Sequence, residues 1–144
     1  MKKVLFLGSK YVGYECLRYL IYNQKKLDIN IVGVLSKKKI SKDRHNVLEL
    51  AKKNNIRIID KLDSIIDFRK VDFIISVQYH RILKNRHIGV ARELAFNLHM
   101  APLPEYRGCN QFSYAIINDD RKFGTTIHKL DDRVDNGDII AEKR

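Results

Sequence analysis

Two polar side chains stand two positions apart at the end of the apolar run LAFNLH. Successive residues of a strand point to opposite faces, so we expect Asn97 and His99 to share one face while Leu98 packs on the other. An amide and an imidazole are both hydrogen-bond donors that stabilise an oxyanion, the charge that acyl transfer develops. The pair therefore suggests acyl-transfer chemistry, and a purely structural histidine is the alternative that stays open.

Four carboxylates, those of Asp131, Asp132, Asp135 and Asp138, lie in the turn DDRVDNGD near the C-terminal end of the chain, where Gly137 permits a tight turn. Aspartates are common in turns for structural reasons, so that alternative also stays open. His128, on the strand before the turn, is placed to orient or tune a nearby carboxylate. A metal site built from His80, His99, His128 and Asp135 is disfavoured, because no HxH, HExxH or Cys/His spacing supports it.

Residues 8–13, GSKYVG, follow the first predicted strand. The dinucleotide fingerprint is G-x-G-x-x-G, and its middle glycine allows a pyrophosphate to approach the backbone. In this sequence Lys10 stands in place of that glycine. NAD(P) binding is therefore disfavoured. A helix N-terminus carrying Ser9 and Lys10 can still hold a phosphate, and a plain strand-to-helix turn is an equally good interpretation.

Alternating strand and helix patterns indicate how these groups are positioned. Apolar runs that read as parallel strands occur at residues 4–8, 29–36, 56–60, 72–77 and 94–99. Helical spacing of apolar residues occurs at residues 12–20, 47–51, 64–68 and 112–116. Two later runs, 124–130 and 139–143, are joined by too short a turn for a crossover and must be antiparallel. We predict one α/β domain with a Rossmann-like, mostly parallel sheet, helices on both faces and an antiparallel edge hairpin.

The ligand site of such a fold is expected beyond the carboxyl ends of the parallel strands. Residues 8–13, 78–83, 97–108 and 131–138 all fall at that edge.

Composition narrows the class of protein. Lys and Arg outnumber Asp and Glu by 28 to 17, a net charge of +11 that favours an anionic partner or a solvated basic surface. Cys16 and Cys109 lack CxxC spacing and suggest reduced thiols. No signal peptide and no apolar run of about 20 residues is found, so we expect a cytoplasmic protein without a membrane partner. Nucleic acid is a disfavoured partner, because the basic residues are spread out and no RNA-stacking motif appears.

Two segments carry a family likeness: residues 96–108, FNLHMAPLPEYRG, and 123–142, FGTTIHKLDDRVDNGDIIAE. Together they resemble the N-terminal catalytic domain of the folate-dependent formyltransferases. That family has an Asn-x-His at a strand end, a proline-bearing loop, and an Asp in a later turn. The resemblance implies that Asn97 and His99 stabilise the oxyanion and that Asp135 accepts the proton of the attacking amine.

The resemblance further implies 10-formyltetrahydrofolate as the formyl donor, with no metal. The segment QYHRIL matches the loop that holds the pterin ring, largely through its backbone. The expected folate-binding residues are Gln78, Tyr79, His80, Arg81, Ile82, Leu83 and Asp131.

The class of acceptor is inferred from residues 109–118, CNQFSYAIIN. This segment is more similar to sugar N-formyltransferases than to the tRNA enzymes. We expect a dTDP- or UDP-linked amino sugar used in polysaccharide biosynthesis. A methionyl-tRNA formyltransferase-like enzyme is the alternative. Residues 37–39, all Lys, are further candidates for the pyrophosphate. The expected acceptor-binding residues are Ser9, Lys10, Met100, Arg107, Asn110 and Gln111.

The resemblance also bears on domain organisation. We expect residues 1–144 to form a single catalytic domain, shortened at its C-terminal end relative to the family. A module that binds folate or nucleotide without turnover is a second hypothesis. Members of the family often use a further domain to form dimers, which makes a homodimer a possible arrangement.

Overall fold

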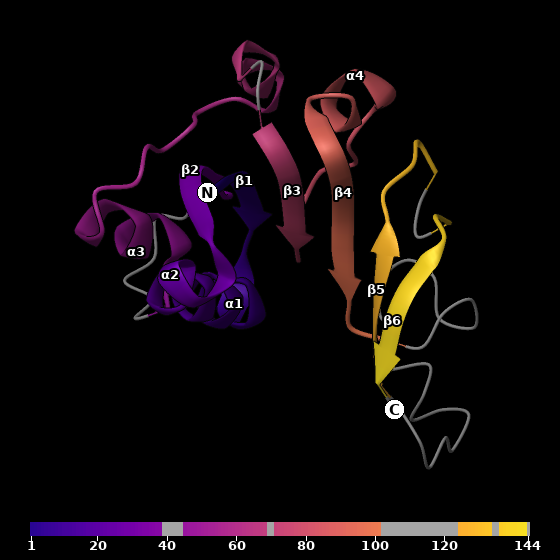
Figure 1. Cartoon of the computed structure of the whole chain (residues 1–144), viewed down its shortest axis with the longest axis horizontal. Coiled ribbons are helices and arrows are strands. Elements are labelled where there is room, and N and C mark those ends of the chain that lie inside the picture. Colours follow the sequence, from indigo (N-terminus) through magenta and orange to yellow (C-terminus); the bar gives the residue numbers. More distant parts are fainter. Residues whose placement is uncertain (39–44, 69–70, 102–123, 134–135, 144) are drawn as a thin grey trace.

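The computed structural model describes residues 1–38, 45–68, 71–101, 124–133 and 136–143. Its centre is a six-stranded sheet in the order β2-β1-β3-β4-β5-β6. The first four strands in this order, β2, β1, β3 and β4, are parallel, whereas β5 runs antiparallel to both β4 and β6 (Figure 1). The predicted fold class is therefore confirmed. The strands are β1 (Lys2–Gly8), β2 (Ile29–Leu35), β3 (Val71–Val77), β4 (Ala91–His99), β5 (Thr125–Lys129) and β6 (Ile139–Lys143).

Helices cover both faces of this sheet. They are α1 (Lys10–Tyr22), α2 (Gln24–Leu27), α3 (Val47–Lys53), the 3₁₀ helix η1 (Leu62–Asp67) and α4 (Asn85–Ile88). On one face α1 and α3 pack on β1 and β2 through a core that includes Val4, Phe6, Leu17, Val47 and Ala51. On the other face η1 packs on β1 and β3 through a core that includes Leu5, Leu7, Leu62, Ile65 and Ile74. The short helices α2 and α4 were not predicted. Within the described residues, no helix is both long enough and apolar enough to cross a bilayer.

Residues 56–60 were predicted to form a parallel strand, and this prediction is wrong. They make only one isolated parallel bridge, between Ile58 and Val34 of β2. Two backbone hydrogen bonds hold it: Val34 donates to the Arg57 carbonyl at 2.9 Å, and Ile59 donates to the Val34 carbonyl at 2.9 Å. The segment then turns into η1, so it ends before a ladder forms.

The carboxyl ends of β1, β3 and β4 meet at one edge of the sheet, since Gly8 pairs with Val77 and Val77 with Leu98. The strand order reverses between β1 and β3, the point where ligands bind in open α/β sheets. There the Ser9 amide donates to the Val77 carbonyl at 3.2 Å. A Cβ atom on Gly13 would lie 3.2 Å from that same carbonyl oxygen, so this glycine serves the close packing of α1 on β3.

Candidate active site

Asn97 and His99 lie on the same face of β4, at the end that reaches the carboxyl edge of the sheet. Their neighbours Phe96 and Leu98 point to the opposite face and line the α1 side of the sheet. The His99 side chain is buried, whereas Asn97 is partly exposed. The predicted alternation of this segment is therefore confirmed.

His128 faces Asn97 across the β4–β5 pair, because the two are partners in the antiparallel register. Its Nδ1 atom lies 2.9 Å from the Lys129 carbonyl oxygen, which can only accept, so Nδ1 carries the proton. In the neutral ring this leaves Nε2 as an acceptor, and the Asn97 amide nitrogen lies 3.2 Å from it, in position to donate. Its imidazole contacts the Asn97 amide, and the orienting of a carboxylate that the sequence suggested stays a prediction, because residues 134–135 of the turn lie outside the described residues.

This amide orientation has a chemical consequence. The NH₂ group of Asn97 has two hydrogens, and His128 takes one of them. The second hydrogen remains to be donated elsewhere. The ring of His99 lies on the same face, with its centroid 6.4 Å from that of His128. The described part of the site thus places two potential hydrogen-bond donors, Asn97 and His99, on one face of the sheet.

The loop after β3, residues 78–83, begins with an unusual backbone. Gln78 has φ of 55°, in the left-handed region that few non-glycine residues adopt. Leu83, at the end of the loop, is buried in the core beside η1, whereas Ile82 and Arg81 are exposed. The loop is thus anchored at one end and displays its middle residues at the carboxyl edge.

Two side chains of this loop have altered ionisation. Burial raises the pKa of the Tyr79 hydroxyl above its ordinary value. Burial also lowers the pKa of His80, and the nearby cations Lys37 and Arg81 lower it further. His80 is therefore largely neutral at pH 7. The ring of Tyr79 meets that of His80 edge to face, with 4.8 Å between centroids.

A small polar recess lies at the start of α1, between the loops that follow β1 and β2. Its lining includes Ser9, Lys10, Lys37 and His45. The Ser9 hydroxyl accepts a hydrogen bond from the backbone amide of Lys37 at 3.3 Å, which ties the two loops together. Lys10 has φ of 62° and an exposed side chain. Two lysines thus flank the N-terminal end of a 13-residue helix, an arrangement that favours anions.

The turn between β5 and β6 is described except for residues 134–135. Asp131 does not point freely toward a ligand: its carboxylate accepts hydrogen bonds from the Arg133 amide at 2.8 Å and from Asn136 at 3.5 Å. The turn also depends on Gly137, where a Cβ atom would lie 1.7 Å from the Lys129 carbonyl oxygen. The role expected of Asp131 in folate binding stays a prediction.

Several predicted site residues lie outside the described residues, and their roles also stay predictions. They are Asp135, Arg107, Asn110, Gln111 and Lys39. Met100 is described and is partly buried, directly after His99. In the part of the chain that is described, no three His, Cys, Asp or Glu side chains are grouped to hold a metal ion.

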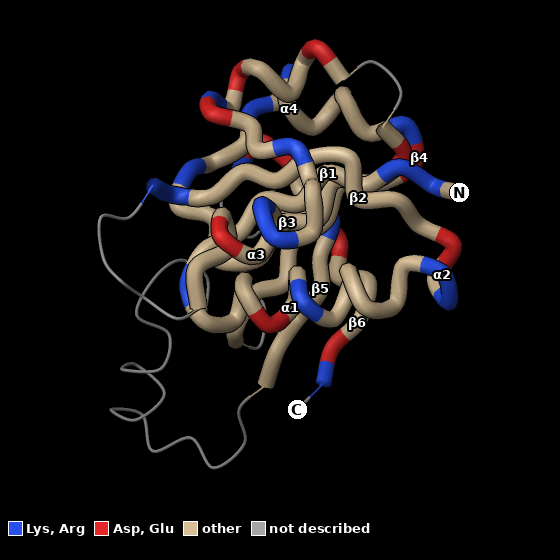
Figure 2. Tube along the Cα trace, turned by 90° about the vertical axis from the view of Figure 1, so that its left-hand side faces the viewer, with Lys and Arg blue, Asp and Glu red and all other residues tan. Residues whose placement is uncertain are grey.

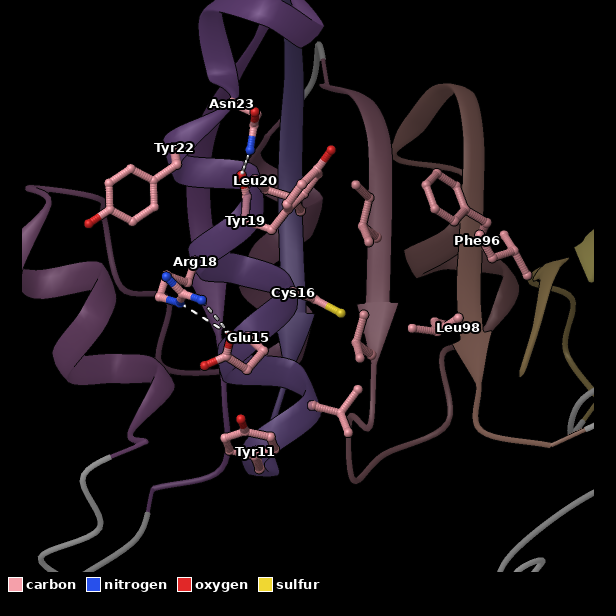
Figure 3. A pocket seen from close by; sticks show the side chains of 14 residues that line it. Tyr11, Glu15, Cys16, Arg18, Tyr19, Leu20, Tyr22, Asn23, Phe96 and Leu98 are labelled. Atoms are coloured by element: carbon pink, nitrogen blue, oxygen red, sulfur yellow. Dashed lines mark hydrogen bonds and ion pairs between the residues drawn. The ribbon is translucent and has the colours of Figure 1, made fainter. Parts of the chain in front are cut away.

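A cavity of about 710 Å³ lies on the opposite face of the sheet from Asn97 and His99. Figure 3 shows Cys16 of α1 and Leu98 of β4 pointing toward one another across it. Burial raises the pKa of the Cys16 thiol, which makes it a poor nucleophile. The cavity is lined mainly by apolar side chains beside α1, and it is separate from Asn97, His99 and His128 on the other face. It is also lined by Val12, Leu20, Ile75, Val77, Phe96 and Ile127.

Three curated relatives match the chain at low to moderate identity. The bifunctional polymyxin resistance protein ArnA of Wigglesworthia glossinidia brevipalpis is 30% identical over 152 residues, covering 99% of this chain and 23% of that protein. A methionyl-tRNA formyltransferase of Limosilactobacillus fermentum is 28% identical over 156 residues, covering 99% of this chain and 48% of that protein. A GDP-perosamine N-formyltransferase of Brucella melitensis is 36% identical over 73 residues, covering 51% of this chain and 28% of that protein. The chain thus spans about half the length of these relatives, or less.

Two solved structures share the fold. The phosphoribosylglycinamide formyltransferase of Bacillus halodurans superposes with a TM-score of 0.82 at 22% identity, covering 99% of this chain and 78% of that one. An N-formyltransferase of Helicobacter canadensis was solved with folinic acid and dTDP-3-aminofucose. It superposes with a TM-score of 0.78 at 24% identity, covering 99% of this chain and 52% of that one. The family model described as "Formyl transferase" matches residues 2–144, almost the whole chain. On this evidence the chain belongs to the formyl transferase family.

Proposed function

We propose that this chain transfers a formyl group from 10-formyltetrahydrofolate to the amino group of a nucleotide-linked amino sugar. One observation carries the proposal: Asn97 and His99 share a face at the carboxyl edge of β4, and His128 holds the Asn97 amide with one hydrogen to spare. Membership of the formyl transferase family supplies the reaction class. We also propose that residues 1–144 form a single catalytic domain.

The proposed chemistry follows from what an amine and a formyl group require. The amine nitrogen attacks the formyl carbon, the formyl oxygen becomes an oxyanion, and the bond from that carbon to N10 of the folate then breaks. Asn97 and His99 would donate hydrogen bonds to that oxygen, and one such donor is typically worth about 10²–10³ in rate. Asp135 would take the proton from the amine, directly or through water, and would pass it on to N10 as the carbon–N10 bond breaks.

The two substrates are assigned to neighbouring loops. The 78–83 loop would hold the pterin ring, since it displays its middle residues beside the end of β4. Lys10 and Lys37, at the N-terminal end of α1, would hold the diphosphate of the acceptor. The recess itself has a volume of only about 10 Å³, so a diphosphate would lie over its mouth, where a helix N-terminus and two cations both favour negative charge.

A nucleotide-linked sugar is supported by two of the proteins that resemble this chain. The Brucella protein is named for GDP-perosamine, and the Helicobacter structure contains dTDP-3-aminofucose together with folinic acid. The basic residues of the described chain are spread over several elements, including α2, α4 and the N-terminal end of β1 (Figure 2). Such a distribution suits a small anionic substrate better than a long polyanion.

Methionyl-tRNA is the second candidate acceptor, and one observation favours it. The methionyl-tRNA formyltransferase of Limosilactobacillus fermentum aligns with 99% of this chain, whereas the GDP-perosamine enzyme aligns with 51%. The two acceptors make opposite demands on the protein, because tRNA needs an extended basic surface and a sugar nucleotide needs one recess.

An acceptor screen tests both candidates. The purified chain is incubated with 10-formyltetrahydrofolate and, separately, with GDP-perosamine, dTDP-3-aminofucose and methionyl-tRNA. Mass spectrometry then detects a product heavier by one carbonyl group. We expect product with an amino-sugar nucleotide, nearly abolished by His99→Ala and retained by Arg92→Ala, a control at the exposed far end of β4. Donor binding without any product would instead support a module that binds folate without turnover.

A further inference from the structure

Thr126 on β5 is a fully buried polar residue at the candidate site. It is the register partner of His99, so both side chains lie on one face of the sheet. One step along the same two strands, Asn97 faces His128. Thr126 therefore completes a block of four polar side chains, two from each strand.

The hydroxyl group of Thr126 makes a bond to the backbone beyond His99. Its Oγ1 atom donates a hydrogen bond to the Ala101 carbonyl oxygen at 2.9 Å. Ala101 is also fully buried, so bulk water does not reach either partner. A buried hydroxyl costs free energy unless it is bonded, and valine would fill the same volume without that cost. The presence of a hydroxyl at this position thus points to the bond itself.

The bond fixes the direction in which the chain leaves β4. Ala101 is two residues after His99, and its carbonyl is held by a strand that is 25 positions later in the sequence. With Ala101 held, the backbone dihedrals of Met100 and His99 have little freedom. The direction of the His99 ring depends on those dihedrals, because a side chain follows its own backbone.

We propose that Thr126 is a positioning residue for His99: its hydroxyl, by holding the Ala101 carbonyl, sets the direction of the imidazole. The consequence for catalysis rests on the function proposed above, whereas the consequence for the ring does not. Misplacement of a reacting group by about 1 Å can cost as much as 10²-fold in rate. A single buried hydroxyl is thus sufficient to affect turnover without touching either substrate.

The test compares Thr126→Val, which keeps the shape and removes the bond, with Thr126→Ser, which keeps the hydroxyl. Thr125→Val is the matched control, since its side chain points to the opposite face of β5. Nitrogen-15 NMR of histidine-labelled protein reports the ring of His99, assigned with His99→Gln. We expect Thr126→Val to shift or broaden the His99 signals, while Thr126→Ser and Thr125→Val leave them unchanged. The signals of His87, distant on α4, should not move in any variant.

Kinetics supply the second readout, with whichever acceptor the unmodified chain formylates. We expect Thr126→Val to lower kcat by about 10-fold while KM for 10-formyltetrahydrofolate stays within about twofold. Thr126→Ser should keep both constants. If Thr126→Val does not fold, Thr126→Ala takes its place, because it also removes the hydroxyl and adds no bulk.

Two results would overturn the positioning role. One is an unchanged His99 spectrum in the folded variant that lacks the hydroxyl. The other is an equal loss in Thr126→Ser, which would assign the effect to methyl packing. If the unmodified chain formylates no acceptor, the proposed function fails, and the NMR comparison alone still decides the role of Thr126.

Discussion

The amide nitrogen of Asn97 and the Nε2 atom of His128 lie 3.2 Å apart across the β4–β5 pair. The Lys129 carbonyl oxygen fixes the protonation of this ring from its other side, at 2.9 Å from Nδ1. A relay of two hydrogen bonds therefore determines which way the amide of Asn97 faces.

Replacing His128 should weaken formyl transfer. His128→Phe keeps a ring of similar size but removes the acceptor, so the Asn97 amide is free to turn. A hydrogen bond of net worth near 1.4 kcal/mol corresponds to about a 10-fold fall in kcat. Steady-state kinetics of the acceptor reaction measures this. Ile127→Val, on the opposite face of β5, is the control and should retain activity; full activity in a folded His128→Phe protein would refute the relay.

The left-handed backbone of Gln78 predicts an order of stability among substitutions. A β-branched side chain is the least tolerant of φ near 55°, so Gln78→Val should lower the free energy of unfolding by about 1–2 kcal/mol. Gln78→Gly should change it by less than about 1 kcal/mol, because relief of strain offsets the added freedom of the unfolded chain. Urea unfolding followed by circular dichroism measures both. Equal stability of the two variants would contradict the assigned backbone.

Gly137 predicts a sharper effect in the turn between β5 and β6. A methyl group there would lie 1.7 Å from the Lys129 carbonyl oxygen, so the backbone of Gly137→Ala must move. We expect a loss of more than about 2 kcal/mol in the free energy of unfolding. Gly89→Ala is the control, since its added methyl group would lie 3.3 Å from the Asn85 carbonyl and requires only a small adjustment. A Gly137→Ala protein as stable as its control would show that the turn is not closed in this way.

Asp63 predicts a pH-dependent contribution to stability. Hydrogen bonds from His87 and Arg86 hold the pKa of the Asp63 carboxyl below its ordinary value. A carboxyl whose pKa is lower in the folded state stabilises the protein above its unfolded pKa, about 3.9, and this contribution is lost as the pH falls further. Thermal midpoints measured from pH 5 down to pH 2 should thus fall less steeply for Asp63→Asn than for the unmodified chain. Asp67→Asn, an exposed carboxyl on the same helix, should follow the unmodified chain, and parallel curves for all three would exclude this contribution.

The sequence predicted the local elements of the fold well. The apolar run before Gly8 became β1, the helical spacing of Val12 and Cys16 became α1, and the short turn before Ile139 joined antiparallel strands. These features depend on side chains close together in the chain, so periodicity and turn length are sufficient to identify them. The family signature around Asn97 and His99 was equally local, and the family is confirmed.

The error at residues 56–60 arose because strand pairing depends on a neighbour that is distant in the sequence. Residues 56–60 have the composition of a strand, yet they form one bridge to Val34 because the chain turns away into η1. Composition measures the tendency of a segment to extend, whereas a ladder requires a neighbour that stays alongside it.

By itself the sequence determined which residues alternate, and therefore that Asn97 and His99 would share a face. Only the tertiary structure decided what lies opposite them, because pairing 97 with 128 and 99 with 126 depends on the register between strands far apart in the chain. A shift of that register by one residue would turn His128 and Thr126 to the apolar face. The hydrogen bonds that orient the Asn97 amide and hold the Ala101 carbonyl are therefore a product of long-range packing.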